Sequence, residues 1–234
     1  MTYRSHDTRR RIVYNSSRMN TTVWLLILIP IAYLLGSIPF GLIVGLSRGV
    51  DPRKAGSGNI GATNVGRLLG GRFFAIVFTL DLLKGLSPML AGAYVLHGQA
   101  HSSVEMLLWL LIAAAAIAGH MFSVFLKFKG GKGVATTLGA ALGVWPYYTL
   151  PALVAAGIFV LVFLTTRIVS IGSIVAAIAF PVALIGVGLW MHWDILGAQL
   201  PLLIFSILIA SLIVYRHREN IRRLLGGKEH AFKK

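Results

Sequence analysis

Residues 23–46 read VWLLILIPIAYLLGSIPFGLIVGL, and this run of 24 residues contains no charged side chain. A helix needs about 20 predominantly apolar residues to cross the hydrocarbon core of a bilayer. Within the run, Gly41 and Gly45 are four residues apart and give one helix face small residues for close packing. The run therefore predicts a membrane-spanning helix at Val23–Leu46.

The composition of the whole chain also indicates lipid as its solvent. The chain has 234 residues, 56% of them hydrophobic and 12% charged, and its mean hydropathy is +0.79. A water-soluble domain of this size cannot bury so much apolar surface, so we expect an all-α integral membrane protein with one domain. The absence of Cys excludes disulfides, thiolate catalysis and Cys-based metal sites.

Other apolar segments predict the rest of the bundle. Further helices are expected at about Phe73–Leu96, Met106–Leu126, Ile171–Trp190 and Leu200–Tyr215. Gly133–Thr166 is ambiguous, because Pro146 and Pro151 lie in its middle and each half is shorter than an upright span of about 20 residues. We expect two short helices or a re-entrant hairpin there. The total is about seven transmembrane helices, or five plus the hairpin.

The cations predict the orientation of this bundle. Ser47–Arg72 holds five Lys and Arg, Lys127–Lys132 three and the C-terminal tail seven, with one more at Arg167, whereas the opposite loops hold none. Because cytoplasmic loops are enriched in Lys and Arg, we expect the basic loops and the C-terminus in the cytoplasm and the N-terminus outside.

Residues 1–22 hold five Arg and conflict with that orientation. We interpret them as a polar, Arg-rich tail that is disordered or lies upstream of the true start, with Met19 as the alternative initiator. The apolar run after Val23 lacks the small-x-small site of a cleavable signal peptide. The membrane domain is therefore expected over residues 23–229, followed by a basic tail at 230–234.

The net charge indicates anionic partners. Lys and Arg outnumber Asp and Glu by 22 to 7, which gives a formal charge of +15. Such a surplus fits anionic lipid, phosphate or nucleic acid. Nucleic acid is disfavoured, because the cations are divided among short loops between lipid-facing segments. We therefore expect the basic, glycine-rich loops to hold phosphorylated substrates.

The first of these loops is GSGNIGATNVGR, Gly56–Arg67. Its glycines fit the G-x-G-x-x-G pattern, but a dinucleotide site needs a preceding strand, and here a membrane helix precedes the loop. Glycines also let N–H groups converge on an anion, and polar side chains add donors. The candidate binding residues are Gly56, Ser57, Asn59, Thr63, Asn64 and Arg67. The alternative is an ordinary interhelical loop.

The second loop is KFKGGKGVAT, residues 127–136. It is not a Walker-type P-loop, because Leu126 stands where the first glycine is required. It opens the helix expected after Gly133, and a helix N-terminus attracts anions. The candidate phosphate-binding residues are Lys129, Gly130, Gly131 and Lys132. The alternative is cytoplasmic loop charge without a binding role.

The third motif is HREN, residues 217–220, in which His217 and Asn220 share one helical face. A histidine there could take a proton or bind phosphate, and the alternative is a basic helix end that contacts anionic lipid. Ser170 is a further candidate whose alternative role is helix capping. Asp81 and Lys84 are expected to form an internal ion pair. No metal-ligand spacing is present.

These motifs resemble, in order and spacing, those of the bacterial acyl-phosphate-dependent glycerol-3-phosphate acyltransferases. The matching segments are Gly36–Gly41, Gly56–Arg67, Asp81–Gly85, Gly119–Thr136, Thr166–Ser173 and His217–Asn220. The resemblance covers about Val23 to Glu229. Ile60 and Ser123 depart from it, because the family frequently has Pro at both positions.

The resemblance implies transfer of a fatty acyl group from acyl phosphate to the 1-hydroxyl of sn-glycerol 3-phosphate. The product would be lysophosphatidic acid, made for phospholipid synthesis at the cytoplasmic face of the bacterial inner membrane. It implies glycerol 3-phosphate, acyl phosphate and membrane lipids as partners, and no cofactor, acyl-CoA or acyl carrier protein. The implied site residues are Ser57, Arg67, Lys129, Lys132, Ser170, His217 and Asn220.

The chemistry fits these residue types. Acyl phosphate is already activated, so no covalent nucleophile is needed, but two anions must be held side by side. We expect Arg67, His217 and Asn220 to hold glycerol phosphate, the Lys129–Lys132 loop to hold acyl phosphate, and an apolar groove to hold the acyl chain. His217 or the donor phosphate would take the hydroxyl proton.

Two competing interpretations are a transporter of an anionic metabolite and a lipid-binding scaffold. The transporter is disfavoured, because such proteins often contain an internal repeat and none is evident in this sequence.

Overall fold

The computed structural model describes residues 4–97 and 102–231, with side chains described from residue 20 onward. These parts of the chain are helices joined by loops, as the all-α prediction expected. The helices are α1 (Arg4–Ser37), α2 (Phe40–Leu46), α3 (Ala62–Leu69), α4 (Gly71–Val95), α5 (Ser103–Met121), α6 (Val134–Leu142), α7 (Thr149–Thr166), α8 (Val169–Trp190), α9 (Leu200–Arg216) and α10 (Arg218–Leu225), with a 3-10 turn at Val124–Leu126.

Five segments in the described part are long and apolar enough to cross a membrane: Asn20–Leu46, α4, Ser103–Leu126, α7 and α8. The pair α9 and α10, bent by 55°, makes a sixth if it is counted as one span. The nine residues of α6 are too few for a span, which takes about 20. The ambiguous segment Gly133–Thr166 thus contains one short helix and the 18-residue α7.

Pro39 divides the first predicted helix. α1 ends at Ser37 and α2 begins at Phe40, because a proline nitrogen has no hydrogen to donate within a helix. A Cβ at Gly41 would collide with the carbonyl oxygen of Ile60, so the first polar loop lies directly against α2. The missing side chain at Gly41 therefore serves loop packing, rather than the helix–helix contact that its spacing suggested.

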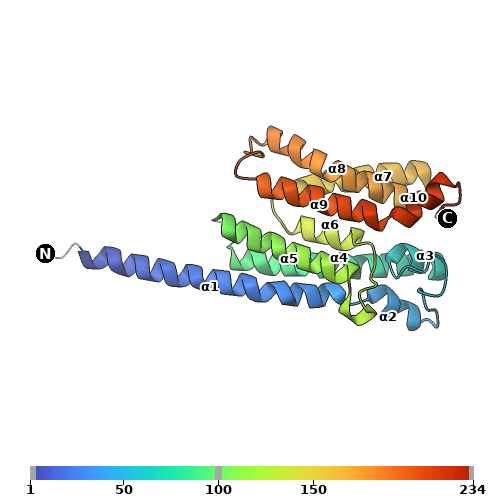
Figure 1. Ribbon diagram of the computed structural model, residues 1–234, viewed down its shortest axis with the longest axis horizontal. Helices are drawn as coiled ribbons and strands as arrows, with labels where there is room; N and C mark the ends of the chain where they lie inside the picture. The colour runs from blue at the N-terminus through green and yellow to red at the C-terminus, as the bar shows by residue number, and fades with distance from the viewer. Residues whose placement is uncertain (1–3, 98–101, 232–234) are drawn as a thin grey trace.

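The N-terminal part of α1 projects beyond the rest of the bundle (Figure 1). Residues 4–22 are helical, and the interpretation of residues 1–22 as a tail outside the membrane domain stays a prediction. Initiation at Met19 stays a prediction. Residues 1–3 and 232–234 of the two predicted tails lie outside the described residues.

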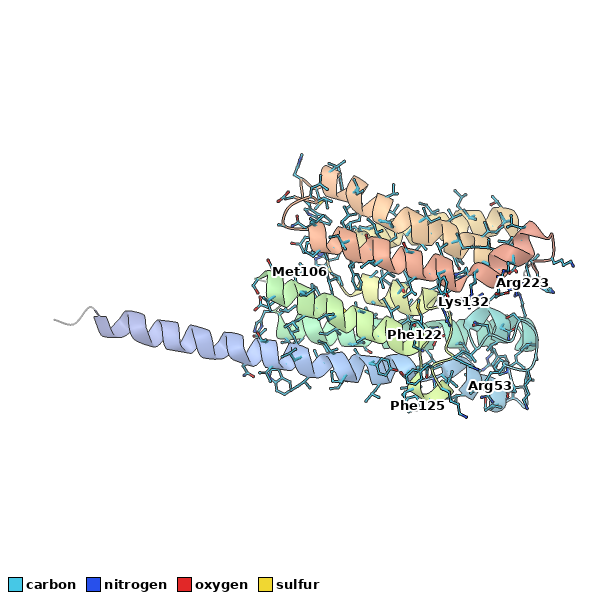
Figure 2. The ribbon with its side chains drawn as sticks, in the orientation of Figure 1. Arg53, Met106, Phe122, Phe125, Lys132 and Arg223 are labelled. Atoms are coloured by element: carbon cyan, nitrogen blue, oxygen red, sulfur yellow. The ribbon has the colours of Figure 1, made fainter. Side chains whose placement is uncertain are left out.

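The helices form two groups, with α1, α4 and α5 in one and α7, α8 and α9 in the other (Figure 1). α6 joins them, since it packs against both α4 and α7. Between the helices, the buried Trp109 donates from Nε1 to the Met89 carbonyl oxygen at 3.2 Å. Figure 2 shows Arg53, Lys132 and Arg223 at one end of the bundle and Met106 at the other. The three basic motifs therefore gather at one end.

Candidate functional site

The three motifs meet at one cleft with an empty volume of about 780 Å³. Its walls come from the first polar loop with α3, the start of α6, the start of α8 and the junction of α9 with α10. Nine of the thirteen predicted site residues line it: Ser57, Asn59, Thr63, Asn64, Arg67, Lys132, Ser170, His217 and Asn220. The four that do not are Gly56, Lys129, Gly130 and Gly131.

Asn64 organises the first loop from within. Its side-chain nitrogen donates to the carbonyl oxygens of Pro52 at 2.9 Å and Asn59 at 2.8 Å. Its side-chain oxygen accepts from the Ser57 N–H at 2.8 Å. Gly56 belongs to the same arrangement, since a Cβ there would collide with that oxygen. Because the amide of Asn64 is used within the loop, Asn64 shapes the loop that presents its neighbours to the cleft.

The glycines of the second loop are turned away from the cleft. The Gly130 N–H donates to the Met121 carbonyl at 3.1 Å, and the Gly131 N–H donates to the His120 carbonyl at 3.0 Å. A Cβ at either glycine would collide with His120. The paired glycines thus let the loop lie directly on the end of α5, where both of their N–H groups are engaged; their role in phosphate binding stays a prediction. Lys129 is exposed outside the cleft.

Lys132 and the first residues of α6 face the cleft instead. Gly133, Val134 and Ala135 line it, and the first N–H groups of a helix have no partner within the helix. The ammonium of Lys132 donates to the side-chain oxygen of Asn220 in a short hydrogen bond. This contact joins the second motif to the third.

The surroundings of Lys132 lower the pKa of its ammonium. Burial is the main cause, and the nearby positive charges of Arg223, Arg67 and Arg216 add to it, while Glu229 acts in the opposite direction. Together they lower the pKa of Lys132 to about 8. The ammonium is thus crowded by other cations, so a bound phosphate would restore its usual preference for the charged form.

His217 lines the cleft with one of its two ring nitrogens already bonded to the backbone. Its Nδ1 lies 2.8 Å from the Ile213 carbonyl oxygen. Because a carbonyl oxygen can only accept, Nδ1 carries a hydrogen, and Nε2 of the neutral ring keeps a free lone pair. The residue is 2% exposed and lines the cleft. This arrangement suits a group that accepts a proton from a bound hydroxyl.

Glu229 is the residue that sequence reasoning missed. Only 2% of its side chain is exposed. One carboxylate oxygen accepts from Ser170 Oγ at 3.0 Å and Asn220 Nδ2 at 2.7 Å, and the other accepts from Arg223 Nε at 2.7 Å. Burial alone would raise its pKa, but these hydrogen bonds lower the pKa of Glu229 below its usual value. The cleft therefore already holds one ionised carboxylate.

Arg67 links the first loop to the C-terminal segment. Its Nη2 donates to the His230 carbonyl oxygen at 2.7 Å. Its Nε is buried and has no hydrogen-bond partner among the described residues. Arg67 therefore has a spare charged donor at the wall of the cleft.

A buried ion pair lies beside the cleft. Lys84 Nζ is 2.9 Å from Asp81 Oδ1, as the spacing of the two residues predicted. The same ammonium donates to the Ile38 carbonyl oxygen at 3.0 Å. Asp81 and His120 line the cleft, and His120 Nδ1 is 3.6 Å from the Asp81 carboxylate. The two charges are partnered, so they support the cleft wall rather than add net charge to it.

An apolar groove with an empty volume of about 680 Å³ adjoins the cleft. The groove runs between α6, α7, α8 and α9, and it shares Phe78, Val134, Phe159 and Ser173 with the cleft. A polar, cationic cleft that opens into an apolar groove suits an amphiphile with an anionic head. The sequence led us to expect such a groove but gave no signal for its aromatic wall.

Comparisons with known proteins agree with the motifs. The family model described as glycerol-3-phosphate acyltransferase matches residues 26–227. A relative of that name from Geotalea daltonii is 46% identical, with 89% of this chain and 98% of the relative covered. The relative from Aquifex aeolicus is 43% identical, with 88% and 98% covered.

Solved structures give the same result. A crystal structure of PlsY, an integral membrane glycerol 3-phosphate acyltransferase, in its glycerol 3-phosphate form matches with a TM-score of 0.77 and 42% identity, over 89% of this chain and 96% of that chain. The lysophosphatidic acid form of PlsY matches with a TM-score of 0.74 and 41% identity, over 89% and 95%.

Proposed function

Since this chain belongs to the glycerol-3-phosphate acyltransferase family, we propose that it moves a fatty acyl group from an acyl phosphate to the 1-hydroxyl of sn-glycerol 3-phosphate. The product is lysophosphatidic acid, and inorganic phosphate leaves. The observation that carries the proposal is the junction of the cationic cleft with the apolar groove. Each substrate has an anionic end, and the donor also has a long apolar chain.

The donor is assigned to the side of the cleft that opens into the groove. Val134 lines both spaces, and Lys132 lies two residues before it at the start of α6. An acyl phosphate can therefore place its phosphate at Lys132 and the α6 N-terminus with its chain in the groove. Lys129 is not part of this assignment, because it lies outside the cleft.

Glycerol 3-phosphate is assigned to the part of the cleft between the first loop and the α9–α10 junction. Ser57, Thr63 and Arg67 from the first loop and α3 line the cleft together with His217 and Asn220. Arg67 supplies a charged donor for the phosphate of glycerol 3-phosphate. The free Nε2 of His217 is then available to the substrate hydroxyl.

The reaction needs no covalent intermediate on the protein. The hydroxyl oxygen attacks the acyl carbonyl carbon, and the bond between that carbon and the phosphate oxygen breaks. The phosphate leaves with the electron pair, and the hydroxyl proton goes to His217 Nε2 or to the donor phosphate. The cations stabilise the charge that develops on the transferring group.

We place the cleft at the cytoplasmic face of the bacterial inner membrane. The support is that the basic segments gather at one end of the bundle (Figure 2) and that loops on the opposite side hold no Lys or Arg. The N-terminus would then lie outside.

The test is product analysis with purified protein in detergent. Radiolabelled glycerol 3-phosphate is offered with acyl phosphate or with acyl-CoA, and lysophosphatidic acid and free phosphate are measured. We expect both products with acyl phosphate only. Turnover of acyl-CoA at the same rate would contradict the proposed donor. In liposomes, flux of glycerol 3-phosphate without lipid product would support the transporter alternative.

A further inference from the structure

We propose that Arg216 is a positioning residue that fixes the Gly130–Gly131 turn and thereby aims the ammonium of Lys132 into the cleft. The inference rests on the proposed function in one respect, that Lys132 binds a substrate phosphate. Arg216 itself does not line the cleft, so it acts through the loop.

The guanidinium of Arg216 holds the outer edge of the turn. Its Nη2 donates to the carbonyl oxygens of Gly130 at 2.8 Å and Gly131 at 2.7 Å, and its Nε donates to Gly131 at 3.2 Å. The guanidinium carbon lies 5.6 Å from the centroid of the Phe122 ring. Phe122 ends α5 and accepts a hydrogen bond from the Tyr33 hydroxyl at 2.8 Å. The cation is thus held between a ring and two carbonyls.

The inner edge of the turn is held by α5. The N–H groups of Gly130 and Gly131 donate to the carbonyls of Met121 and His120. Each glycine is therefore bonded through both of its backbone groups. Its N–H donates to a carbonyl at the end of α5, and its own carbonyl accepts from Arg216. Because the glycines carry no side chain, these hydrogen bonds and their close packing on α5 define the turn.

Lys132 follows this turn directly, and the α9–α10 junction holds it at two points. Arg216, the last residue of α9, binds the peptide groups before Lys132, whereas Asn220 of α10 binds its ammonium. The position of Lys132 is therefore set by the same segment that carries His217. One segment thus fixes the positions of Lys132, assigned to the acyl donor, and His217, assigned to glycerol 3-phosphate, relative to each other.

The contacts require arginine rather than a generic cation. A planar guanidinium can donate in one plane to two adjacent carbonyls and lie flat on a ring, whereas a lysine ammonium cannot do both. Arg218 is a matched comparison on the next helix. It is exposed and lies 4.7 Å over the Tyr215 ring, and no hydrogen bond joins it to the Gly130–Gly131 turn.

Arg216 affects Lys132 in two ways, through the hydrogen bonds that position the loop and through the repulsion between the two positive charges. Substitutions at Arg216 can separate these two effects. Its positive charge contributes to the low pKa of Lys132. The charged or titratable groups that bear on Lys132 are Glu229, Arg223, Arg67, Arg216 and His217. Removal of the charge should therefore raise the pKa of Lys132, and a substitution that keeps the charge should leave it in place.

The experiment compares R216K, R216Q and R218Q in the full chain, with kcat, KM for acyl phosphate and the pH profile of kcat/KM measured at saturating glycerol 3-phosphate. A misplacement of about 1 Å in a substrate-binding group can lower the rate about 100-fold, so we expect kcat to fall about 10- to 100-fold in R216K and R216Q. The basic limb of the profile should move to higher pH in R216Q only. R218Q should stay within about twofold of the unchanged chain.

Wild-type kcat in R216K would overturn the proposal, because the fork geometry would then be dispensable. An equal loss in R218Q would overturn it as well, since net charge alone would explain the effect. If R216Q does not fold, R216K still carries the test, and F122L, which removes the ring that supports the guanidinium, should lower kcat as well. If no acyl transfer is detected even in the unchanged chain, the proposed function fails, and the pH dependence of acyl phosphate binding to R216Q and to the unchanged chain still tests the link to Lys132.

Discussion

The low pKa of Lys132 predicts a basic limit on activity. With a pKa of about 8, only about one tenth of the free protein carries a charged Lys132 at pH 9, whereas a lysine with the ordinary pKa of about 10.4 would remain almost fully charged. If only the charged form binds the donor phosphate, kcat/KM should fall about tenfold for each pH unit above 8. The assay is initial-rate measurement from pH 6.5 to 10 with acyl phosphate as donor.

The profile of kcat should differ from that of kcat/KM. The bound phosphate is an opposite charge next to the ammonium, so it raises the pKa of Lys132 in the complex. The basic limb of kcat should therefore lie at higher pH than the limb of kcat/KM, which reports the free protein. In Lys132→Arg the cation stays charged throughout this range, so the limb should vanish even if the rate is lower. A limb retained in this variant would refute the assignment to Lys132.

Loss of activity above pH 8 should not come from unfolding. The pKa of Lys132 is lower in the folded chain than in the unfolded one, so the unfolded chain binds more protons between about pH 8 and 10.4. Through linkage, the contribution of Lys132 to stability rises as the pH increases across this window. Thermal unfolding followed in the same buffers separates the two effects, since activity and the contribution of Lys132 to stability change in opposite directions.

Three further substitutions test the site. Glu229→Gln removes a charged acceptor whose hydrogen bonds are worth about 1.5–3 kcal/mol each, so thermal stability and kcat/KM should both fall, and wild-type values for both would contradict its role in the cleft. Arg67→Ala should lower kcat/KM about 100- to 1,000-fold, as removal of a charge-stabilising donor does, while the melting temperature stays unchanged. Near-normal activity would contradict the proposal that Arg67 binds a substrate anion. Gly131→Ala places a Cβ against His120 and should lower the free energy of unfolding by about 1–3 kcal/mol. The control is Gly157→Ala, where a Cβ meets nothing within 4 Å. Equal stability of the two variants would show that the turn can move away from α5.

Most of the fold follows from local sequence. Long apolar runs define where helices can cross lipid, and the prolines near residue 148 correctly indicated a break within Gly133–Thr166. The separation of α1 from α2 was missed, because a single Pro39 within an apolar run can either bend a helix or end it. In the structure α1 ends before Pro39, and α2 then packs its Gly41 against the Ile60 carbonyl of the first polar loop.

The site was predictable as a set of segments and less so as a set of contacts. Polar residues that are dense within a loop mark a binding region, and the loops converge as expected. Gly130 and Gly131 were given a phosphate-binding role because paired glycines suit both an anion nest and close packing, and sequence alone does not distinguish the two. Glu229 could not be predicted from the sequence, because a single acidic residue in a basic tail matches no motif. Its role becomes visible only when the chain folds back and brings it to Ser170 and Asn220.

Glu229 also explains how a cleft with so many cations can fold before any substrate arrives. Arg67, Lys132 and Arg223 lie close enough to influence one another, and their mutual repulsion would disfavour the empty site. One carboxylate offsets part of that repulsion and bonds to Arg223 directly. The remaining positive charge adds to burial in lowering the pKa of Lys132, and it would be available to the two anionic substrates that we propose. Binding of these two anions would relieve repulsion that the folded chain already bears, which would favour their joint occupation of the cleft.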